Sequence, residues 1–363
     1  MNPFTFEAHI PRVVFGPSTL RRLPEEIERL GAVRALVLST PEQAALARSV
    51  AELLGKRSAG VFARAVMHVP IETAREAREE ARRLGADCAV AIGGGSTTGL
   101  GKAIALDSGL PIVAIPTTYA GSEMTPIYGL TEGGVKKTGG DPRVLPRTVI
   151  YDPELTLTLP VGLSVTSGLN AIAHAAEGLY AHDGNPIVSL MAEEGIRLLA
   201  RALPALHRTP QHLQARSDAL AGAWLCGTVL GHVSMGLHHK LCHTLGGSFD
   251  LPHAEVHTVV LPHALAYNAP QAPEALARIA RALGTDDAPA ALQAFARGLG
   301  APTSLREIGM PEDGLDRAAD LAVAAPYPNP RPLDRVALRA LLQRAWEGAS
   351  PVAVSPRGAR RHT

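Results

Sequence analysis

Short, continuous apolar runs alternate with amphipathic helical patterns through the first part of the chain. The apolar runs predict strands at 12–16, 35–39, 63–69, 88–92 and 112–115. Between them, apolar residues at helical spacing predict helices at 18–30, 41–54, 71–84 and 99–106. Runs without polar alternation are typical of strands buried on both faces. We therefore expect a parallel sheet with helices on both of its faces.

The pattern changes after residue 160, where strand-like runs become rare and helical periodicity takes over. Helices are predicted at 164–182, 186–203, 213–234, 240–245, 253–267, 273–283, 288–299 and 333–346. We expect an α/β N-terminal domain at 1–158 and an all-helical C-terminal domain at 159–350. Residues 351–363 are basic and interrupted by Pro and Gly, which favours a flexible tail.

Composition narrows the class of protein. The chain has 363 residues, of which 46% are hydrophobic and 19% are charged, as in soluble globular proteins. The formal net charge of +1 gives no argument for a nucleic-acid or membrane partner. Cys88, Cys226 and Cys242 are odd in number and lack a Cys-x-x-Cys spacing, which favours reduced thiols. No signal peptide and no membrane-spanning apolar run is visible, so we expect a cytoplasmic protein.

A glycine-rich turn is the first candidate ligand-binding feature. The segment 92–98, Ile-Gly-Gly-Gly-Ser-Thr-Thr, leaves a predicted buried strand and enters a helix. Consecutive glycines let the backbone approach a ligand closely, and the N–H groups at a helix start attract anions. A pyrophosphate is the expected ligand. The alternative interpretation is a tight strand-to-helix turn that needs glycine only for its positive φ. The segment differs from the G-x-G-x-x-G fingerprint.

A second polar loop, 116–123, also follows a buried strand. Its hydroxyl groups and its glycine would lie at the carboxyl edge of the sheet, where open α/β sheets bind ligands. An ordinary Thr/Ser-rich connection is the alternative. Together with the glycine turn, this loop indicates one shared cleft.

Histidines are spaced so that they can meet in the helical part of the chain. His239 and His243 are four residues apart, which puts both imidazoles on one face of a helix. Asn170 and His174 repeat this spacing, and His253 follows Pro252 at an expected helix start. Groups on facing helices can build one site. Hydrogen-bonded core histidines are the alternative.

These motifs occur in an order that resembles the iron-containing alcohol dehydrogenase family. The motifs are Gly93–Ser96 with Lys102, Pro116–Thr118 with Gly121–Glu123, Ala173–Glu177, His239 with His243, and Pro252 with His253. Further segments are similar to the maleylacetate reductases within that family: Thr118–Thr125, Val144–Pro146, Val149–Pro153, Ser167–Ala171 and Tyr327–Arg331. The resemblance implies a dinucleotide-binding α/β domain, a helical catalytic domain, a cleft between them, and a homodimer.

The resemblance also implies the cofactor and its contacts. NADH is the expected cofactor, and NADPH is expected to be accepted as well, because Thr40 replaces an acidic residue that repels a 2′-phosphate. Gly99 stands where the family places an aspartate. The candidate cofactor-binding residues are Gly93, Gly94, Gly95, Ser96, Thr97, Lys102, Thr117, Thr118, Tyr119, Ser122 and Thr40.

At the family's metal site the resemblance implies a departure. The positions of its aspartate and three histidines are Asn170, His174, His239 and His253 here. An asparagine removes the only anionic ligand, so metal affinity should fall. We expect a vestigial site and no required metal.

The implied reaction is NAD(P)H-dependent reduction of the carbon–carbon double bond of 2-maleylacetate, giving 3-oxoadipate in aromatic-compound catabolism. Hydride addition leaves an enolate, which hydrogen-bond donors can stabilise in place of a metal. His174, His239 and His253 are the expected donors, Asn170 completes the site, and His243 is the expected general acid.

A substrate with two carboxylates also calls for cations. Lys136 and Lys137, near Arg143, are candidates for binding it, although a solvated basic loop is equally compatible. Tyr327 is a further candidate. A metal-dependent alcohol or polyol dehydrogenase remains the nearest alternative function. A dehydroquinate-synthase-like lyase and a non-catalytic binding protein are more distant ones.

Overall fold

The computed structural model describes residues 3–133, 135–325 and 327–352. The chain divides into two compact units, each described here by itself. The α/β unit comprises residues 7–160 and 209–232, and the helical unit comprises the described parts of 1–6, 161–208 and 233–363. Every helix in the described ranges is too short or insufficiently apolar to cross a lipid bilayer.

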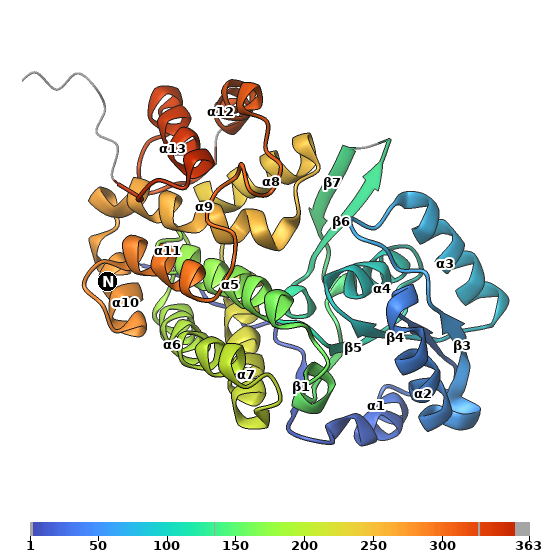
Figure 1. Cartoon of the computed structure of the whole chain (residues 1–363). Coiled ribbons are helices and arrows are strands. Elements are labelled where there is room, and N and C mark those ends of the chain that lie inside the picture. The colour runs from blue at the N-terminus through green and yellow to red at the C-terminus, as the bar shows by residue number, and fades with distance from the viewer. Residues whose placement is uncertain (1–2, 134, 326, 353–363) are drawn as a thin grey trace, which may run out of the picture. The chain divides into compact units, whose positions relative to one another are not determined.

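A parallel six-stranded sheet forms the centre of the α/β unit (Figure 1). Its order is β1-β8-β5-β4-β2-β3, and all neighbouring strands run parallel. The strands are β1 (Arg12–Phe15), β2 (Ala35–Leu38), β3 (Ser58–Phe62), β4 (Cys88–Gly93), β5 (Ile112–Pro116) and β8 (Thr148–Tyr151). Strands β2, β4, β5 and β8 are buried along their whole length, as continuous apolar runs predict.

Helices cover both faces of this sheet because alternate strand residues point to opposite faces. In β2, Val37 packs in one core with α1 (Leu23–Arg29) and α2 (Ala44–Leu54). Leu36 and Leu38 pack in a second core with α3 (Ile71–Arg83) and α4 (Gly95–Ser108). The expected α/β architecture is confirmed.

Two further elements complete the α/β unit. Strands β6 (Ile127–Glu132) and β7 (Val135–Gly140) form an antiparallel hairpin. Helix α7 (Leu213–Leu230) belongs to this unit although it follows α6 (Pro186–Arg208), a helix of the other unit, in sequence. Its buried Arg216 donates hydrogen bonds to the Tyr119 hydroxyl and to the carbonyls of Pro210 and Leu159.

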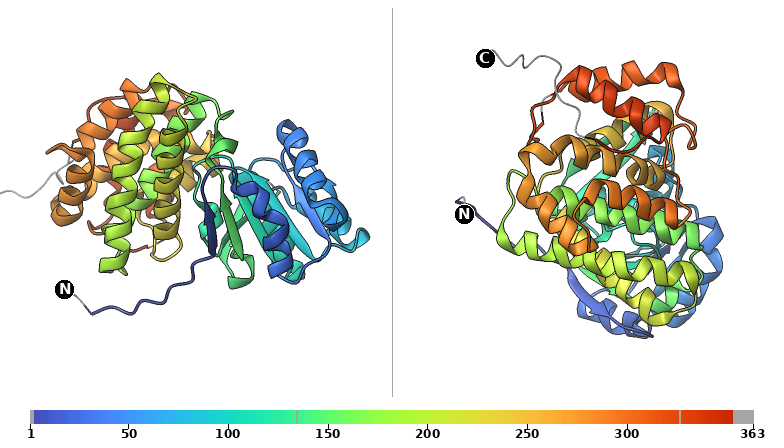
Figure 2. Two further views of the ribbon diagram at one scale, coloured as in Figure 1. Left: turned by 90° about the horizontal axis from the view of Figure 1, so that it is seen from below. Right: turned by 60° about the vertical axis from the view of Figure 1, so that its left-hand side comes forward.

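The helical unit is built around α5 (Val161–Gly178), which is buried from Ser164 to Gly178. Its many small residues let neighbouring helices pack closely around it, which suits the centre of a bundle. Helix α6 lies alongside it (Figure 2). The other helices are α6 (Pro186–Arg208), α8 (Leu237–Phe249), α9 (His253–Asn268), α10 (Pro273–Leu283), α11 (Ala288–Gly298), α12 (Leu315–Val323) and α13 (Arg335–Glu347).

The predicted strand at 63–69 is wrong. The strand is β3, Ser58–Phe62, and His68 and Val69 lie in a turn with φ of +64° and +46°. Apolar Val66, Met67 and Val69 give 63–69 the sequence pattern of a strand, whereas Gly60 weakens that pattern in the observed strand β3. The sequence prediction also missed the β6–β7 hairpin, β8 and α12.

The expected domain limits stay a prediction. Residues 209–232 fall inside the range expected for the helical domain but pack in the α/β unit. Most of the expected tail, 353–363, lies outside the described residues.

Candidate active site

The glycine turn joins β4 to α4 in a conformation that only glycine adopts easily. Gly93 has φ of +150°, and a Cβ there would lie 2.5 Å from Thr97 Oγ1 and 2.8 Å from Gln43 Oε1. Gly94 is the N-cap of α4, and Gly95 is exposed at its first turn. The first N–H groups of a helix lack intrahelical partners. The turn therefore offers unshielded backbone donors to an anion.

Three polar loops meet at the same edge of the sheet. Thr40 follows β2, the glycine turn follows β4, and Thr117 follows β5, and these strands are direct neighbours. Thr117 donates its N–H to the Gly93 carbonyl at 3.0 Å. Its hydroxyl accepts a hydrogen bond of 3.0 Å from Gln43. The loops predicted to share a cleft are therefore brought together, and Gln43 is an addition that sequence analysis missed.

Other candidate cofactor residues in these loops differ in how they are placed. Thr118 lies against Gly94, where an added Cβ would come within 3.2 Å of its hydroxyl oxygen. Ser96 is partly exposed, and the Thr97 hydroxyl oxygen is buried without a hydrogen-bond partner. Ser122 begins a short 3-10 helix, Ser122–Met124.

Lys102 and Tyr119 face the protein interior, and their expected contact with the cofactor stays a prediction. Lys102 is fully buried, and its Nζ donates to the carbonyls of Ser122, Thr125 and Ile127 and to the Thr125 hydroxyl at 2.7–2.9 Å. Burial lowers the pKa of Lys102 to about 7, against the attraction of Glu123. Tyr119 is also fully buried, with its hydroxyl hydrogen bonded by Arg216. Both residues support the loop from within.

The predicted substrate lysines lie on a strand and not in a loop. Lys136 and Lys137 are in β7, and Lys137 forms an exposed ion pair with Glu132 at 2.7 Å. Nearby Arg143 is paired with Asp141 at 2.8 Å. The Lys136 side chain lies outside the described part of the structure. Substrate binding by these residues stays a prediction.

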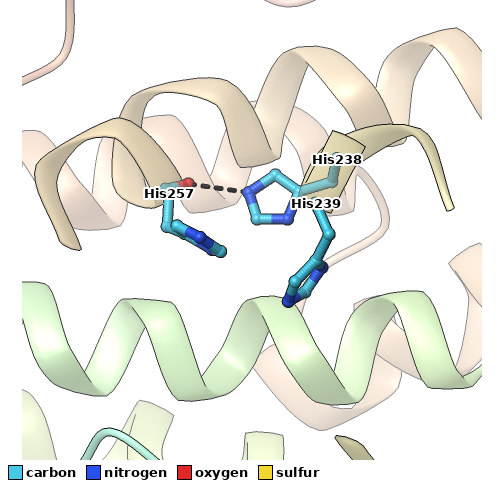
Figure 3. A group of neighbouring side chains, drawn as sticks. All are labelled: His238, His239 and His257. Atoms are coloured by element: carbon cyan, nitrogen blue, oxygen red, sulfur yellow. Dashed lines mark hydrogen bonds between the residues drawn. The ribbon is translucent and has the colours of Figure 1, made fainter. Parts of the chain in front are cut away.

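Imidazoles from three helices gather in the helical unit. His174 comes from α5, His239 from α8, and His257 from α9. The ring centroids of His174 and His239 are 4.9 Å apart, and those of His239 and His257 are 5.0 Å apart. Figure 3 shows His238 and His257 joined through the His257 carbonyl, with His239 pointing toward α5. The predicted convergence of histidines therefore occurs within this unit.

A hydrogen-bonded chain runs through the buried side of this imidazole cluster. His174 Nδ1 lies 2.8 Å from His239 Nε2. His239 Nδ1 lies 2.7 Å from Glu177 Oε2. Asn170 is buried beside His174 on α5, one helical turn away, and its Oδ1 has no hydrogen-bond partner. Glu177 ends the family motif Ala173–Glu177, but the sequence analysis predicted no role for it.

Sequence analysis did not identify two further histidines of the cluster, His238 and His257. His238 donates through Nε2 to the His257 carbonyl at 3.0 Å. Both ring nitrogens of His257 are buried, and neither has a hydrogen-bond partner among the described residues. Burial lowers the pKa of His238 and His239 to about 3 and that of His257 well below its usual value. These rings are neutral near pH 7. Their i, i+4 spacing to Cys242 and His253 was the available signal.

The cluster is open at one end. His243 is exposed and His253 is partly buried. The His243 ring centroid lies 6.2 Å from that of His239, and the His253 centroid lies 4.4 Å from that of His257. A molecule that approaches the cluster would therefore meet these two imidazoles.

Tyr327 lies on the connection between α12 and α13. Its hydroxyl oxygen is buried and has no hydrogen-bond partner in the described part of the chain, and Lys240 Nζ lies 5.8 Å from its ring centroid. Burial and the nearby charge of Glu177 raise the pKa of Tyr327. Its role toward a substrate stays a prediction.

A separate cavity of about 650 Å³ in the helical unit is lined by Glu177, Tyr180, Ser234, Gln271 and Asn329, among other residues. None of the described histidines of the imidazole cluster lines it. It is therefore distinct from the open end of the cluster.

Two family models together cover most of the chain. Residues 11–153 match the model described as iron-containing alcohol dehydrogenase. Residues 164–346 match the C-terminal model of the Fe-containing alcohol dehydrogenase family. The chain belongs to the iron-containing alcohol dehydrogenase family.

Full-length relatives refine this membership. The chain is 69% identical to a maleylacetate reductase of Burkholderia cepacia, over 97% of this chain and 100% of the relative. It is 59% identical to a maleylacetate reductase of Sphingobium indicum, over 96% of this chain and 99% of the relative. The crystal structure of maleylacetate reductase from Agrobacterium tumefaciens superposes with a TM-score of 0.94 at 57% identity, covering 97% of this chain and 100% of that chain.

A family named for iron implies a metal, but the residues at the expected ligand positions fit one poorly. Asn170, His174, His239 and His253 offer no carboxylate, so the set lacks a negative charge to offset a cation. Both ring nitrogens of His239 are already engaged, one by Glu177 and one by His174. As arranged, the four residues therefore do not fit a divalent metal.

A dinucleotide, by contrast, fits the glycine turn. Gly95 is exposed at the helix start, and among the described residues the buried Thr97 hydroxyl has no hydrogen-bond partner. The backbone N–H groups and the hydroxyls of Thr117 and Thr118 surround one edge of the sheet. These groups would hold a pyrophosphate, with the rest of the cofactor extending from this edge.

Proposed function

We propose that this chain is a maleylacetate reductase, an oxidoreductase that uses NADH to reduce the carbon–carbon double bond of 2-maleylacetate to 3-oxoadipate. The observation that carries the proposal is the match to relatives of this name at 59–69% identity over nearly the whole chain. The imidazole cluster supports it, because it offers neutral hydrogen-bonding groups and no carboxylate ligand.

The chemistry of the substrate explains why hydrogen bonds suffice. The double bond is conjugated to a ketone, so a hydride that adds at the carbon beta to the ketone leaves an enolate. Its charge is shared between carbon and oxygen, and it is less basic than the alkoxide of a simple ketone reduction. Donors aimed at that oxygen stabilise the charge as it develops. The nicotinamide, when bound, supplies the hydride.

The hydrogen bonds inside the cluster change the expected division of roles. Both ring nitrogens of His239 are hydrogen bonded, one to Glu177 and one to His174. His239 therefore holds the cluster together and does not donate to the substrate. His253, at the open end, is the better donor to the enolate oxygen. His243, which is exposed and one helical turn from His239, protonates the adjacent carbon as general acid in this proposal. The added hydride and this proton together complete the reduction.

We also propose the metal requirement, the cofactor range and the oligomeric state of the enzyme. A metal is not required, because the cluster replaces its Lewis acid with hydrogen bonds. NADPH is accepted beside NADH, because Thr40 carries no charge to repel a 2′-phosphate. The working enzyme is a homodimer, which light scattering of the purified protein would measure.

An assay with two substrate classes tests the function. NADH oxidation is followed with maleylacetate, and NAD reduction is followed with short primary alcohols and diols in the same preparation. We expect turnover with maleylacetate alone. Alcohol oxidation without maleylacetate reduction would instead establish the alternative, a metal-dependent alcohol or polyol dehydrogenase.

A further inference from the structure

Glu177 is a buried carboxylate at the last turn of α5, and it closes the start of α8. Its Oε1 accepts the N–H of His238 at 2.8 Å and the hydroxyl of Tyr180 at 3.1 Å. Its Oε2 accepts the N–H groups of Gly236 and His239 at 3.1 and 3.2 Å. Donors thus converge on both oxygens of a side chain that has no solvent exposure.

This environment suits a carboxylate and not a carboxylic acid. The first N–H groups of a helix have no partner within the helix, and the helix dipole favours negative charge there. A protonated Glu177 would place its own O–H among the backbone N–H groups of Gly236, His238 and His239, which can only donate. The residue therefore acts purely as an acceptor.

The same carboxylate determines which nitrogen of His239 carries the hydrogen. Glu177 Oε2 lies 2.7 Å from His239 Nδ1, so that nitrogen must be the donor. In the neutral ring the other nitrogen, Nε2, then has a lone pair. His174 Nδ1 lies 2.8 Å from it and must donate in turn. One direction of hydrogen bonding therefore runs from His174 through His239 to Glu177.

We propose that Glu177 is a positioning residue of the active site, which fixes His239 as the Nδ1–H tautomer and thereby orients His174. Carboxylate–histidine pairs fix ring orientation in other catalytic sites in this way. Here the carboxylate also fastens the start of α8, the helix that presents His243. Its importance to the reaction rests on the proposed function, but the tautomer does not.

Histidine-selective ¹⁵N NMR of the wild-type enzyme tests the tautomer directly. The His239 signals are assigned by comparison with His239→Asn. We expect a protonated Nδ1 in a strong hydrogen bond and an unprotonated Nε2. An Nε2–H tautomer, or rapid exchange between the two, would overturn the proposal even if every Glu177 variant failed to fold.

Kinetics test the effect on the reaction. Glu177→Gln is expected to lower kcat for maleylacetate by roughly 10- to 100-fold with an unchanged KM for NADH. Tyr180→Phe, which removes one neutral donor and leaves the His239 contact, should keep its kcat. Asp334→Ala removes a helix-capping carboxylate, from α13, that contacts no histidine, and it should lower the melting temperature without changing kcat.

The outcomes separate this proposal from the proposed function. A folded Glu177→Gln enzyme with a wild-type kcat would overturn the positioning role. A wild-type enzyme that is inactive with maleylacetate, but whose His239 is the Nδ1–H tautomer, would reject the proposed function and support the hydrogen-bonded chain.

Discussion

At the scale of single residues, the imidazoles of the cluster divide by exposure and not by sequence spacing. His239 and His243 share one helix face, yet His239 is buried with both nitrogens engaged and His243 is exposed. Spacing predicts which side chains meet, because it follows from helix geometry. It does not predict which of them hydrogen bonds to which, because that depends on a carboxylate brought from another helix.

Replacing His243 tests its role as general acid. His243→Asn is expected to lower kcat by roughly 10²- to 10⁴-fold, because the proton would then come from water. The KM for NADH should stay unchanged, since the proposed cofactor contacts lie elsewhere in the chain. His207→Asn, at an exposed position on α6, is the control. Steady-state kinetics with maleylacetate measure both, and equal kcat values for the two variants would exclude His243 from proton transfer.

A substitution at Gly93 tests whether the glycine turn binds the cofactor. Gly93→Ala places a Cβ 2.5 Å from Thr97 Oγ1 at a φ of +150°, so the turn must shift. We expect the KM for NADH to rise about tenfold, equivalent to about 1.4 kcal/mol of binding energy. Gly109→Ala is the matched control, because Gly109 also has positive φ, on the far end of α4, but its Cβ would meet open space. A similar KM for both variants would contradict the assignment of the turn to the cofactor.

At the scale of elements, Lys102 shows how a helix can shape a loop. Its ammonium group fastens residues 122–127 to α4 by donating to the carbonyls of Ser122, Thr125 and Ile127. The sequence comparison with the family made Lys102 a candidate cofactor-binding residue. Burial of the whole side chain, which spacing alone cannot reveal, gives it a supporting role.

Lys102→Met is therefore expected to destabilise the fold as well as weaken the cofactor site. Each buried carbonyl that loses its donor costs roughly 1–3 kcal/mol. The free energy of unfolding, from urea titration, should fall accordingly, and the KM for NADH should rise as the loop relaxes. Lys56→Met, at an exposed position, is the control. An unchanged unfolding free energy for Lys102→Met would show that the loop does not depend on this lysine.

Elements with a strong pattern were predictable, and those without one were not. Helices α9 and α10 and the strands β2 and β4 follow apolar periodicity, and their limits agree closely with the prediction. Strand β3 was displaced because Gly60 weakens its pattern while the turn at 66–69 imitates a strand. Helix α7 has the sequence pattern of the helical bundle, but its buried Arg216, the ring contact of Trp224 with Phe15 and the close approach of Gly227 to Gly121 tie it to the α/β unit.

At the scale of the whole molecule, burying so many imidazoles makes stability depend on pH. The pKa values of His238 and His239 are lowered to about 3 by burial, from the ordinary value of 6.5. As pH falls below 6.5, the unfolded chain gains protons on these groups that the folded chain does not gain. Stability is therefore full above pH 6.5 and is lost progressively as the pH falls toward 3.

The variant His257→Leu isolates part of this effect. The pKa of His257 is also lowered by burial, and its ring nitrogens have no partners to lose. We expect the variant to be more stable than wild type by about 1–3 kcal/mol at pH 7, because an unsatisfied polar group is removed. The advantage should grow toward pH 4. Urea unfolding at several pH values measures this, and a constant difference across pH would contradict it.

The central claim is that an iron-family scaffold performs this reduction with a hydrogen-bonded imidazole cluster in place of a metal. The most direct measurement is maleylacetate-dependent NADH oxidation before and after prolonged chelation, with metal analysis of the same sample. We predict an unchanged rate in protein freed of metal. A rate that is lost on chelation and restored by adding a divalent metal would contradict the claim.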